Sequence, residues 1–299
     1  MIVSASRRTD IPACYPDWFY QRIREGFVLT RNPMRFHQVS KIILSPETVD
    51  GIVFWTKNPA PMMLRLDELN AYAYYFLLTL TSYGKDIEPN VPAKSNEVIP
   101  TFQRLSDKIG PERVIWRYDP ILLSEKYTID YHLEYIHEIA KRLKGYTQKC
   151  IISFVDRYRN TDANLGSLGL EDIVDSAKRR LAESIAQTAR SFGINVETCA
   201  EEIDLNAYGI GHAKCIDGNL LDKIRGYPLK VFKDKNQRPH CGCDASVDIG
   251  MYNTCKNGCK YCYANYNTRA LKSNAAGHDP FSPLLIGSIG EDDVIKERI

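Results

Sequence analysis

The sequence lacks an apolar run long enough to cross a membrane. Its longest apolar run, at 72–80, is interrupted by Thr79 and falls well short of the roughly 20 residues that a membrane helix needs. The N-terminal residues, Met-Ile-Val-Ser-Ala-Ser-Arg-Arg-Thr-Asp, lack the long apolar segment that is typical of a secretion signal. We therefore expect no membrane partner and, by default, a cytoplasmic, reducing compartment.

The sequence also lacks an excess of either charge. Its 299 residues include 39 lysines and arginines against 37 acidic residues, a formal net charge of +2. Proteins that bind nucleic acid usually have a marked basic excess, so a nucleic-acid partner is disfavoured but left open. With 44% hydrophobic and 25% charged residues, and no repeat or low-complexity stretch, the composition predicts an ordinary globular protein.

Cysteine is scarce in the first two thirds of the chain and concentrated afterwards. Only Cys14 and Cys150 precede residue 199, and we expect these two to be packing residues. A disulfide framework is disfavoured, because the total of nine is odd and no secretion signal is present. The clustering instead predicts metal binding by the other seven, which are Cys199, Cys215, Cys241, Cys243, Cys255, Cys259 and Cys262.

Short apolar strands alternate with amphipathic helices along the chain. A hairpin is predicted at 28–30 and 39–44, and helices at 16–26, 59–69, 97–109, 130–144 and 170–192. Six consecutive strand–helix units predict an α/β fold with a parallel sheet in residues 1–232, followed by a cysteine-rich region at 233–299. The six predicted strands lie at 2–5, 51–55, 73–80, 113–116, 150–155 and 194–196.

Polar residues follow the predicted strands where each strand ends. In parallel sheets and barrels the ligand site lies at the carboxyl ends of the strands, so these residues predict one polar mouth. The alternative is that any strand becomes polar on leaving the core. Arg117 and Asp119 are candidates for substrate binding and catalysis, or for a mutual ion pair. Glu197 is a third candidate, which either contacts a ribose or amine or belongs to a solvated rim.

The strongest motif is Cys255-Lys-Asn-Gly-Cys259-Lys-Tyr-Cys262. Three thiolates within eight residues can converge on one metal centre, and thiolates suit iron–sulfur clusters or zinc. A structural zinc site wants four closed ligands. A lone triplet leaves one iron of a four-iron cluster without a protein ligand, which favours a [4Fe-4S] cluster with an open iron.

Two resemblances support this interpretation. Residues 252–264, including Tyr261 before the last cysteine, resemble the cluster loop of the radical S-adenosylmethionine enzymes. Most of the chain also resembles a bacterial domain of unknown function, family 1848, through residues 4–13, 55–59, 116–120 and the cysteine-rich tail. That second resemblance implies no substrate.

The radical resemblance implies a partial (β/α)6 TIM-like barrel and a [4Fe-4S] cluster held by Cys255, Cys259 and Cys262. It further implies that the open iron chelates S-adenosyl-L-methionine. Reductive cleavage of this cofactor then gives methionine and a 5′-deoxyadenosyl radical, which abstracts hydrogen from the substrate. The implied partners are a small-molecule substrate of unknown identity and an electron donor such as flavodoxin or ferredoxin.

The order of parts departs from that family. Its cluster loop normally follows the first strand, where this chain instead has Arg7, Arg8 and Asp10. The family's glycine-rich stretch after the second strand is also missing, and polar residues stand near that position. The residues that we expect to contact the cofactor are Arg7, Arg8, Asp10, Thr56, Lys57, Asn58 and Tyr261.

The remaining four cysteines, Cys199, Cys215, Cys241 and Cys243, either bind a second cluster or a zinc ion, or are buried structural thiols. The single residue between Cys241 and Cys243 would strain shared ligation of one metal. Three functions therefore stay open. The chain is a radical enzyme, a non-catalytic iron–sulfur carrier or sensor, or a barrel protein with a structural zinc site.

Overall fold

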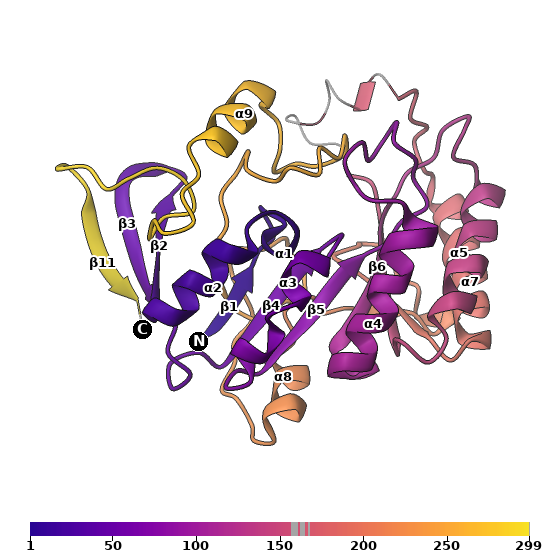
Figure 1. Ribbon diagram of the computed structural model, residues 1–299. Helices are drawn as coiled ribbons and strands as arrows, with labels where there is room; N and C mark the ends of the chain where they lie inside the picture. The colour runs from indigo at the N-terminus through magenta and orange to yellow at the C-terminus, as the bar shows by residue number, and fades with distance from the viewer. Residues whose placement is uncertain (157–160, 162–164, 167, 299) are drawn as a thin grey trace.

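An eight-stranded parallel sheet forms the centre of the molecule (Figure 1). The computed structural model describes residues 1–298 except 157–160, 162–164 and 167. Each of the six predicted strands is present, as β1 (Ile2–Ala5), β4 (Gly51–Thr56), β5 (Tyr74–Thr79), β6 (Val114–Ile121), β7 (Lys149–Phe154) and β8 (Asn195–Thr198). They are neighbours in that order and all run parallel.

The fold is mixed α/β, as predicted. Because the parallel sheet is open and not closed on itself, the predicted partial TIM-like barrel is not confirmed. The sequence analysis missed the two edge strands, β10 (Val247–Asp248) beside β1 and β9 (Gly211–His212) beside β8. Both contain only two residues, and within the described chain they end the sheet rather than pair with each other. The edge strand β10 belongs to the cysteine-rich region, which thereby joins the main sheet.

Helices cover one face of the sheet. They are α1 (Ile11–Cys14), α2 (Pro16–Glu25), α3 (Ala60–Met63), α4 (Ile99–Ile109), α5 (Ile129–Leu143) and α7 (Asp175–Ser191). The predicted helix at 59–69 is divided into α3 and a 3₁₀ turn at Leu66–Leu69. The predicted helix at 170–192 begins only at Asp175, because the Glu171 amide donates to the Leu123 carbonyl at 2.9 Å and the chain there is extended.

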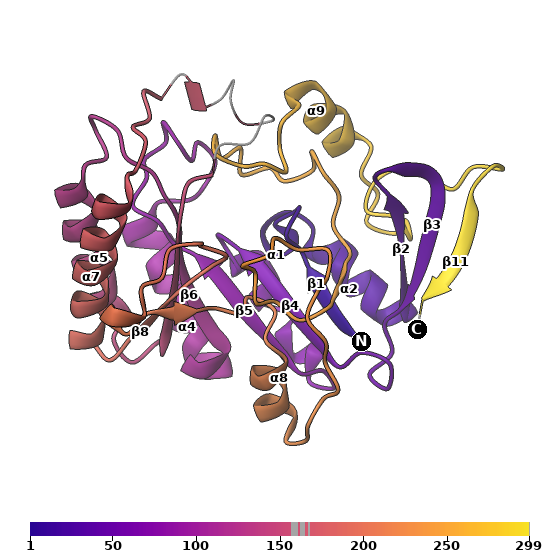
Figure 2. The ribbon, with the colours of Figure 1, turned by 180° about the vertical axis from the view of Figure 1, so that it is seen from behind.

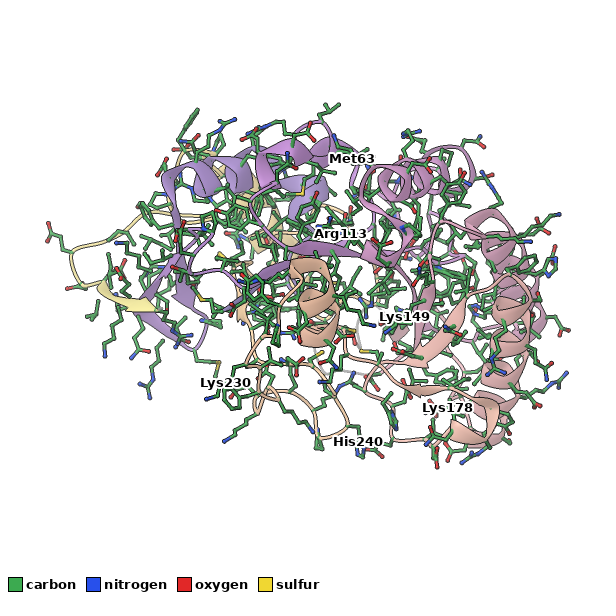
Figure 3. All side chains as sticks on the ribbon, turned by 90° about the horizontal axis from the view of Figure 1, so that it is seen from below. Met63, Arg113, Lys149, Lys178, Lys230 and His240 are labelled. Atoms are coloured by element: carbon green, nitrogen blue, oxygen red, sulfur yellow. The ribbon has the colours of Figure 1, made fainter. Side chains whose placement is uncertain are left out.

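The two faces of the sheet have different coverings. Alternate residues such as Phe54, Phe76 and Trp116 pack under the helices. On the other face Val53, Ile115 and similar residues pack against α8 (Gly218–Arg225) and against four cysteines. Figure 2 shows the segment between β8 and β10 crossing this second face. In Figure 3, Met63 of the helical layer and His240 of that segment lie on opposite sides of the sheet.

A second, three-stranded sheet stands at one end of the molecule (Figure 1). The predicted hairpin is confirmed as antiparallel β2 (Phe27–Asn32) and β3 (Arg35–Ile43). The C-terminal strand β11 (Val294–Arg298) adds to β3 in parallel, after the chain has passed through α9 (Thr268–Ala276). Among the described residues, none of the helices combines the length and the apolar content that a membrane crossing requires.

Candidate functional site

The loop at 255–262 lies where β1 and β4 end. Hydrogen bonds to Asp10 fix it there, since the Asp10 Oδ2 accepts from the Asn257 side chain and from the Lys57 amide, both at 2.8 Å. The hydroxyls of Thr9 and Thr254 are 2.6 Å apart just before the loop. Gly258 has φ +69°, a conformation that side chains disfavour. The triplet therefore sits at the carboxyl ends of parallel strands.

A buried carboxylate supports the loop from the other side. Glu88, 1% exposed, pairs with the ammonium groups of Lys57 at 2.7 Å and Lys94 at 2.6 Å. It also accepts hydrogen bonds from the hydroxyls of Thr81, at 2.9 Å, and Tyr261. Burial alone would raise the pKa of Glu88, but the two ammonium groups lower it to about 2. Glu88 is thus an anion at neutral pH that binds the loop through Tyr261.

The three loop thiols are enclosed by protein. Cys255 and Cys259 are buried and Cys262 is half-buried. Burial raises the pKa of the Cys262 thiol to about 11, so this thiol keeps its proton at neutral pH. Burial also raises the pKa of Cys259, while the nearby Lys57 ammonium acts in the opposite direction.

The other four cysteines form a second group on the face of the sheet away from the helices. The Sγ atoms of Cys199 and Cys215 are 3.4 Å apart. The Cys215 thiol also lies near Cys243, and the Cys243 thiol lies near Cys241. The structure therefore brings together all four cysteines that the sequence analysis grouped, in a succession of contacts.

Two half-buried guanidinium groups lie beside this second group. Arg7, at the end of β1, reaches the Cys243 thiol, and Arg117 of β6 lies near Cys199 and Cys215. The Trp55 ring lies between them, with guanidinium carbons 5.7 Å and 4.7 Å from its centre. These side chains form a cationic, aromatic patch between the loop and the second group.

Residues 2–264 match the sequence model of one family, described as a domain of unknown function, DUF1848. The chain belongs to the DUF1848 family. The match spans the eight-stranded sheet and both groups of cysteines and ends two residues after Cys262. A comparison with curated proteins found no match.

Within the DUF1848 domain, the three predicted catalytic residues do not all lie together. Arg117 and Asp119 form an ion pair with each other. Glu197 pairs with Lys149 at 3.0 Å. Although both Arg117 and Glu197 are in register with Ile151, they are two strand spacings apart, about 10 Å. The structure thus joins Arg117 to Asp119 but gives Glu197 a different partner.

In this structure, several residues of the DUF1848 domain that were predicted to contact a cofactor contact other residues of the chain. The Thr56 hydroxyl accepts from the Asn58 amide at 3.0 Å, and the Asn58 side chain accepts from the Ala60 amide at 3.2 Å. The Arg8 guanidinium lies 5.0 Å from the centre of the Tyr252 ring. These contacts organise the turn after β4 and the segment before the loop.

Sequence reasoning missed Cys14 as a member of the loop group. Its Sγ accepts a hydrogen bond from the Lys256 amide at 3.4 Å, and its thiol is within hydrogen-bond reach of Cys255. The only signal was that Cys14 follows the first strand closely, as do Arg7 and Asp10. Glu88 was missed as well, because it belongs to no motif.

The thiols do not have the arrangement of a metal site in this structure. In the described part of the DUF1848 domain and its C-terminal extension, no three His, Cys, Asp or Glu side chains stand where they could hold a metal ion together. The chemistry of the donors nevertheless fits a soft metal, because each group consists of neighbouring thiols, and rotation about the cysteine side-chain bonds can bring their sulfur atoms together. Metal binding would therefore require the cysteine side chains to rotate.

Proposed function

We propose that the chain is an iron–sulfur enzyme of the radical S-adenosylmethionine type, acting on a substrate that remains to be found. The observation that carries this proposal is the placement of three cysteines on one short loop at the carboxyl ends of parallel strands. Cys255, Cys259 and Cys262 would hold a [4Fe-4S] cluster. When bound, that cluster together with S-adenosylmethionine supplies one-electron cleavage of the sulfonium and a hydrogen-abstracting radical.

The remainder of the loop's surroundings supports the proposal. Lys57 places a buried ammonium near the Cys259 thiol, where it favours an anionic centre. Glu88 fixes that ammonium at 2.7 Å and also holds Tyr261, so the loop is oriented from β4 and from the segment after β5. Asp10 holds the loop to the end of β1. These residues orient the thiols and exclude water from them.

The open parallel sheet supports the partial six-unit barrel that the radical resemblance implies. Its face away from the helices carries Trp55 and Arg117, and Arg7 lies beside the Trp55 ring. This patch is the part of the site best suited to receive a polar substrate, because two cations and an indole supply hydrogen-bond donors there. An electron donor such as flavodoxin or ferredoxin would deliver the electron.

The test is to purify the full chain without oxygen and measure iron, labile sulfide and zinc. We expect about four iron and four sulfide per chain. S-Adenosylmethionine should change the electron paramagnetic resonance spectrum of the reduced protein, and methionine and 5′-deoxyadenosine should form after reduction. Replacing Cys255, Cys259 and Cys262 with alanine should remove the iron and sulfide, the spectral change and the cleavage products. The matched variant Cys150→Ala should keep all of them. Zinc without sulfide would overturn the proposal.

One observation favours a second candidate, a closed centre without catalytic function. Cys14 lies at Cys255, so the loop has a fourth thiol within reach. If Cys14 were a ligand, each iron or a single zinc ion would be saturated by protein, as in an electron carrier or a structural site. The variant Cys14→Ala separates the two candidates, because only the closed centre needs this thiol to retain its metal.

A further inference from the structure

The second group of cysteines is held in place by three segments of backbone. The Ala213 amide donates to the Thr198 carbonyl at 2.7 Å, which joins the segments that carry Cys199 and Cys215. The Asp244 amide donates to the Ile216 carbonyl at 3.0 Å, which joins the segments of Cys215 and Cys243. Because these hydrogen bonds fix the backbone, only the thiol groups need to rotate to meet at one point.

One thiol of this group already accepts a hydrogen bond from the backbone. The Ile216 amide donates to the Cys243 sulfur at 3.4 Å. An amide placed in this way would stabilise a thiolate, and hydrogen bonds to the sulfur are how proteins tune thiolate-bound metals. Although only one residue separates Cys241 from Cys243, their two thiols lie near each other.

Two guanidinium nitrogens beside the group lack a hydrogen-bond acceptor in the described part of the chain, although Arg117 pairs with Asp119 and Arg7 lies 4.0 Å from Asp234. Arg7 Nη2 and Arg117 Nε are buried and have no hydrogen-bond partner there. Neutral thiols are weak acceptors, whereas ionised groups make the stronger hydrogen bonds. Four thiolates around a divalent cation carry a net charge of −2 and accept stronger hydrogen bonds than neutral thiols do. An anionic metal–thiolate centre would thus offer acceptors to these two N–H groups.

One sulfur–sulfur distance in the group fits a single ion better than a cluster. Zinc–sulfur bonds of about 2.3 Å place neighbouring sulfurs of a tetrahedral site about 3.8 Å apart. The Cys199 and Cys215 sulfurs are at 3.4 Å, close to that separation. In a four-iron cluster each cysteine binds a different iron, which holds the cysteine sulfurs farther apart.

We propose that Cys199, Cys215, Cys241 and Cys243 bind a single zinc ion on the face of the sheet opposite the helices, separate from the loop centre. The site is closed, because four protein thiolates fill a tetrahedral zinc ion. Its role is structural, since it fastens the segment after β8 and the segment before β10 across the sheet. The proposal is independent of the chemistry at the loop.

The experiment uses three variants of the full chain, purified anaerobically. The variant C255S/C259S/C262S removes the loop thiols, C215S/C243S removes half of the second group, and C150S is the control for loss of a buried thiol. We expect about one zinc per chain in the wild type, the loop variant and the control. In C215S/C243S, zinc per chain should fall at least about tenfold, while iron and sulfide persist.

A second measurement avoids dependence on the folding of C215S/C243S. Cobalt(II) is exchanged for zinc in the loop variant, and its absorption spectrum reports the number of thiolates and the coordination geometry. Intense thiolate-to-cobalt bands with tetrahedral ligand-field bands are the expected result. Absence of zinc from the loop variant, iron with sulfide in its place, or unchanged zinc in C215S/C243S would each overturn the proposal. Iron and sulfide in C215S/C243S report separately on the loop centre.

Discussion

The two groups of cysteines in this protein are built in opposite ways. The loop group takes three thiols from eight consecutive residues, whereas the second group takes four thiols from segments spread over residues 199–243. Carboxylates and ammonium groups surround the first, through Asp10, Glu88 and Lys57. Guanidinium groups surround the second. A short loop can present thiols on one side of a metal and leave the other side accessible, whereas three fixed segments enclose it.

The largest expected effect is on cofactor cleavage. Cys259→Ala removes a ligand of the proposed cluster, so reductive cleavage of S-adenosylmethionine should fall by about 10³-fold or more, to background. Cys243→Ala affects only the closed site, and its rate per folded chain should stay within about tenfold of the wild type. Formation of 5′-deoxyadenosine measures both. Equal losses in the two variants would show that the groups are not functionally distinct.

Next in size is the effect of removing the charge that supports the loop. Glu88→Gln leaves the buried Lys57 and the half-buried Lys94 ammonium groups without their carboxylate, which should cost about 3–5 kcal/mol of unfolding free energy. Urea unfolding of the metal-free chain measures this loss. The matched control is Glu138→Gln, an exposed residue of α5, for which we expect a change below about 0.5 kcal/mol. Similar losses of unfolding free energy in both variants would show that Glu88 does not support the loop.

The same carboxylate should make stability depend on acid. Because the folded pKa of Glu88, about 2, lies below its ordinary value of 4.5, the unfolded chain binds the proton more readily between those two values. The stabilisation is therefore complete above about pH 4.5 and is lost as the pH falls toward 2. It amounts to roughly 3 kcal/mol. In Glu88→Gln the difference in unfolding free energy between pH 5 and pH 3 should shrink; an unchanged difference contradicts the assignment.

A smaller effect is expected at the second group. Arg7→Met removes a guanidinium beside Cys243 but leaves all four proposed zinc ligands in the chain. Zinc affinity should therefore fall by about 10- to 100-fold. Competition with a chromogenic chelator measures this affinity. Arg24→Met is the control, because Arg24 is exposed on α2 and pairs with Glu68. Zinc retention equal to that of the control would leave Arg7 without a role at the metal.

The smallest effect separates an open loop centre from a closed one. Cys14→Ala should leave iron and sulfide per chain unchanged and cost only about 1 kcal/mol of stability. The reason is that the three loop cysteines suffice for the cluster and Cys14 contributes packing beside Cys255. Iron analysis and thermal unfolding are the measurements. Loss of iron would identify Cys14 as a fourth ligand and favour the non-catalytic centre.

The sequence was informative wherever the signal was local. Six of the eight strands of the main sheet and the hairpin at β2 and β3 follow from apolar periodicity, and the triplet follows from its spacing. The edge strands β9 and β10 have only two residues each, too short for a periodic pattern, and β11 depends on a partner more than 250 residues away. Predicting them required knowledge of the tertiary fold.

The candidate site shows the same limit. The grouping of the loop cysteines could be predicted from spacing, but Glu88 is one of 37 acidic residues and stands out only through its burial between two lysines. Glu197 stands near the end of a strand like the other candidates, and only the structure shows that its partner is Lys149. Side-chain partners depend on register and rotamer, which a single sequence does not specify.

The pairing of β10 with β1 also has a consequence for biosynthesis. Chains emerge from the ribosome with the N-terminus first, so β1 and Asp10 are exposed long before residues 247–262 are made. Until then the outer edge of β1 has no neighbour, and Glu88 has no Tyr261 to hold. The loop can thus be assembled only after residues 247–262 have been made. A ribosome that stalls before residue 247 releases a chain whose sheet lacks the edge strand β10.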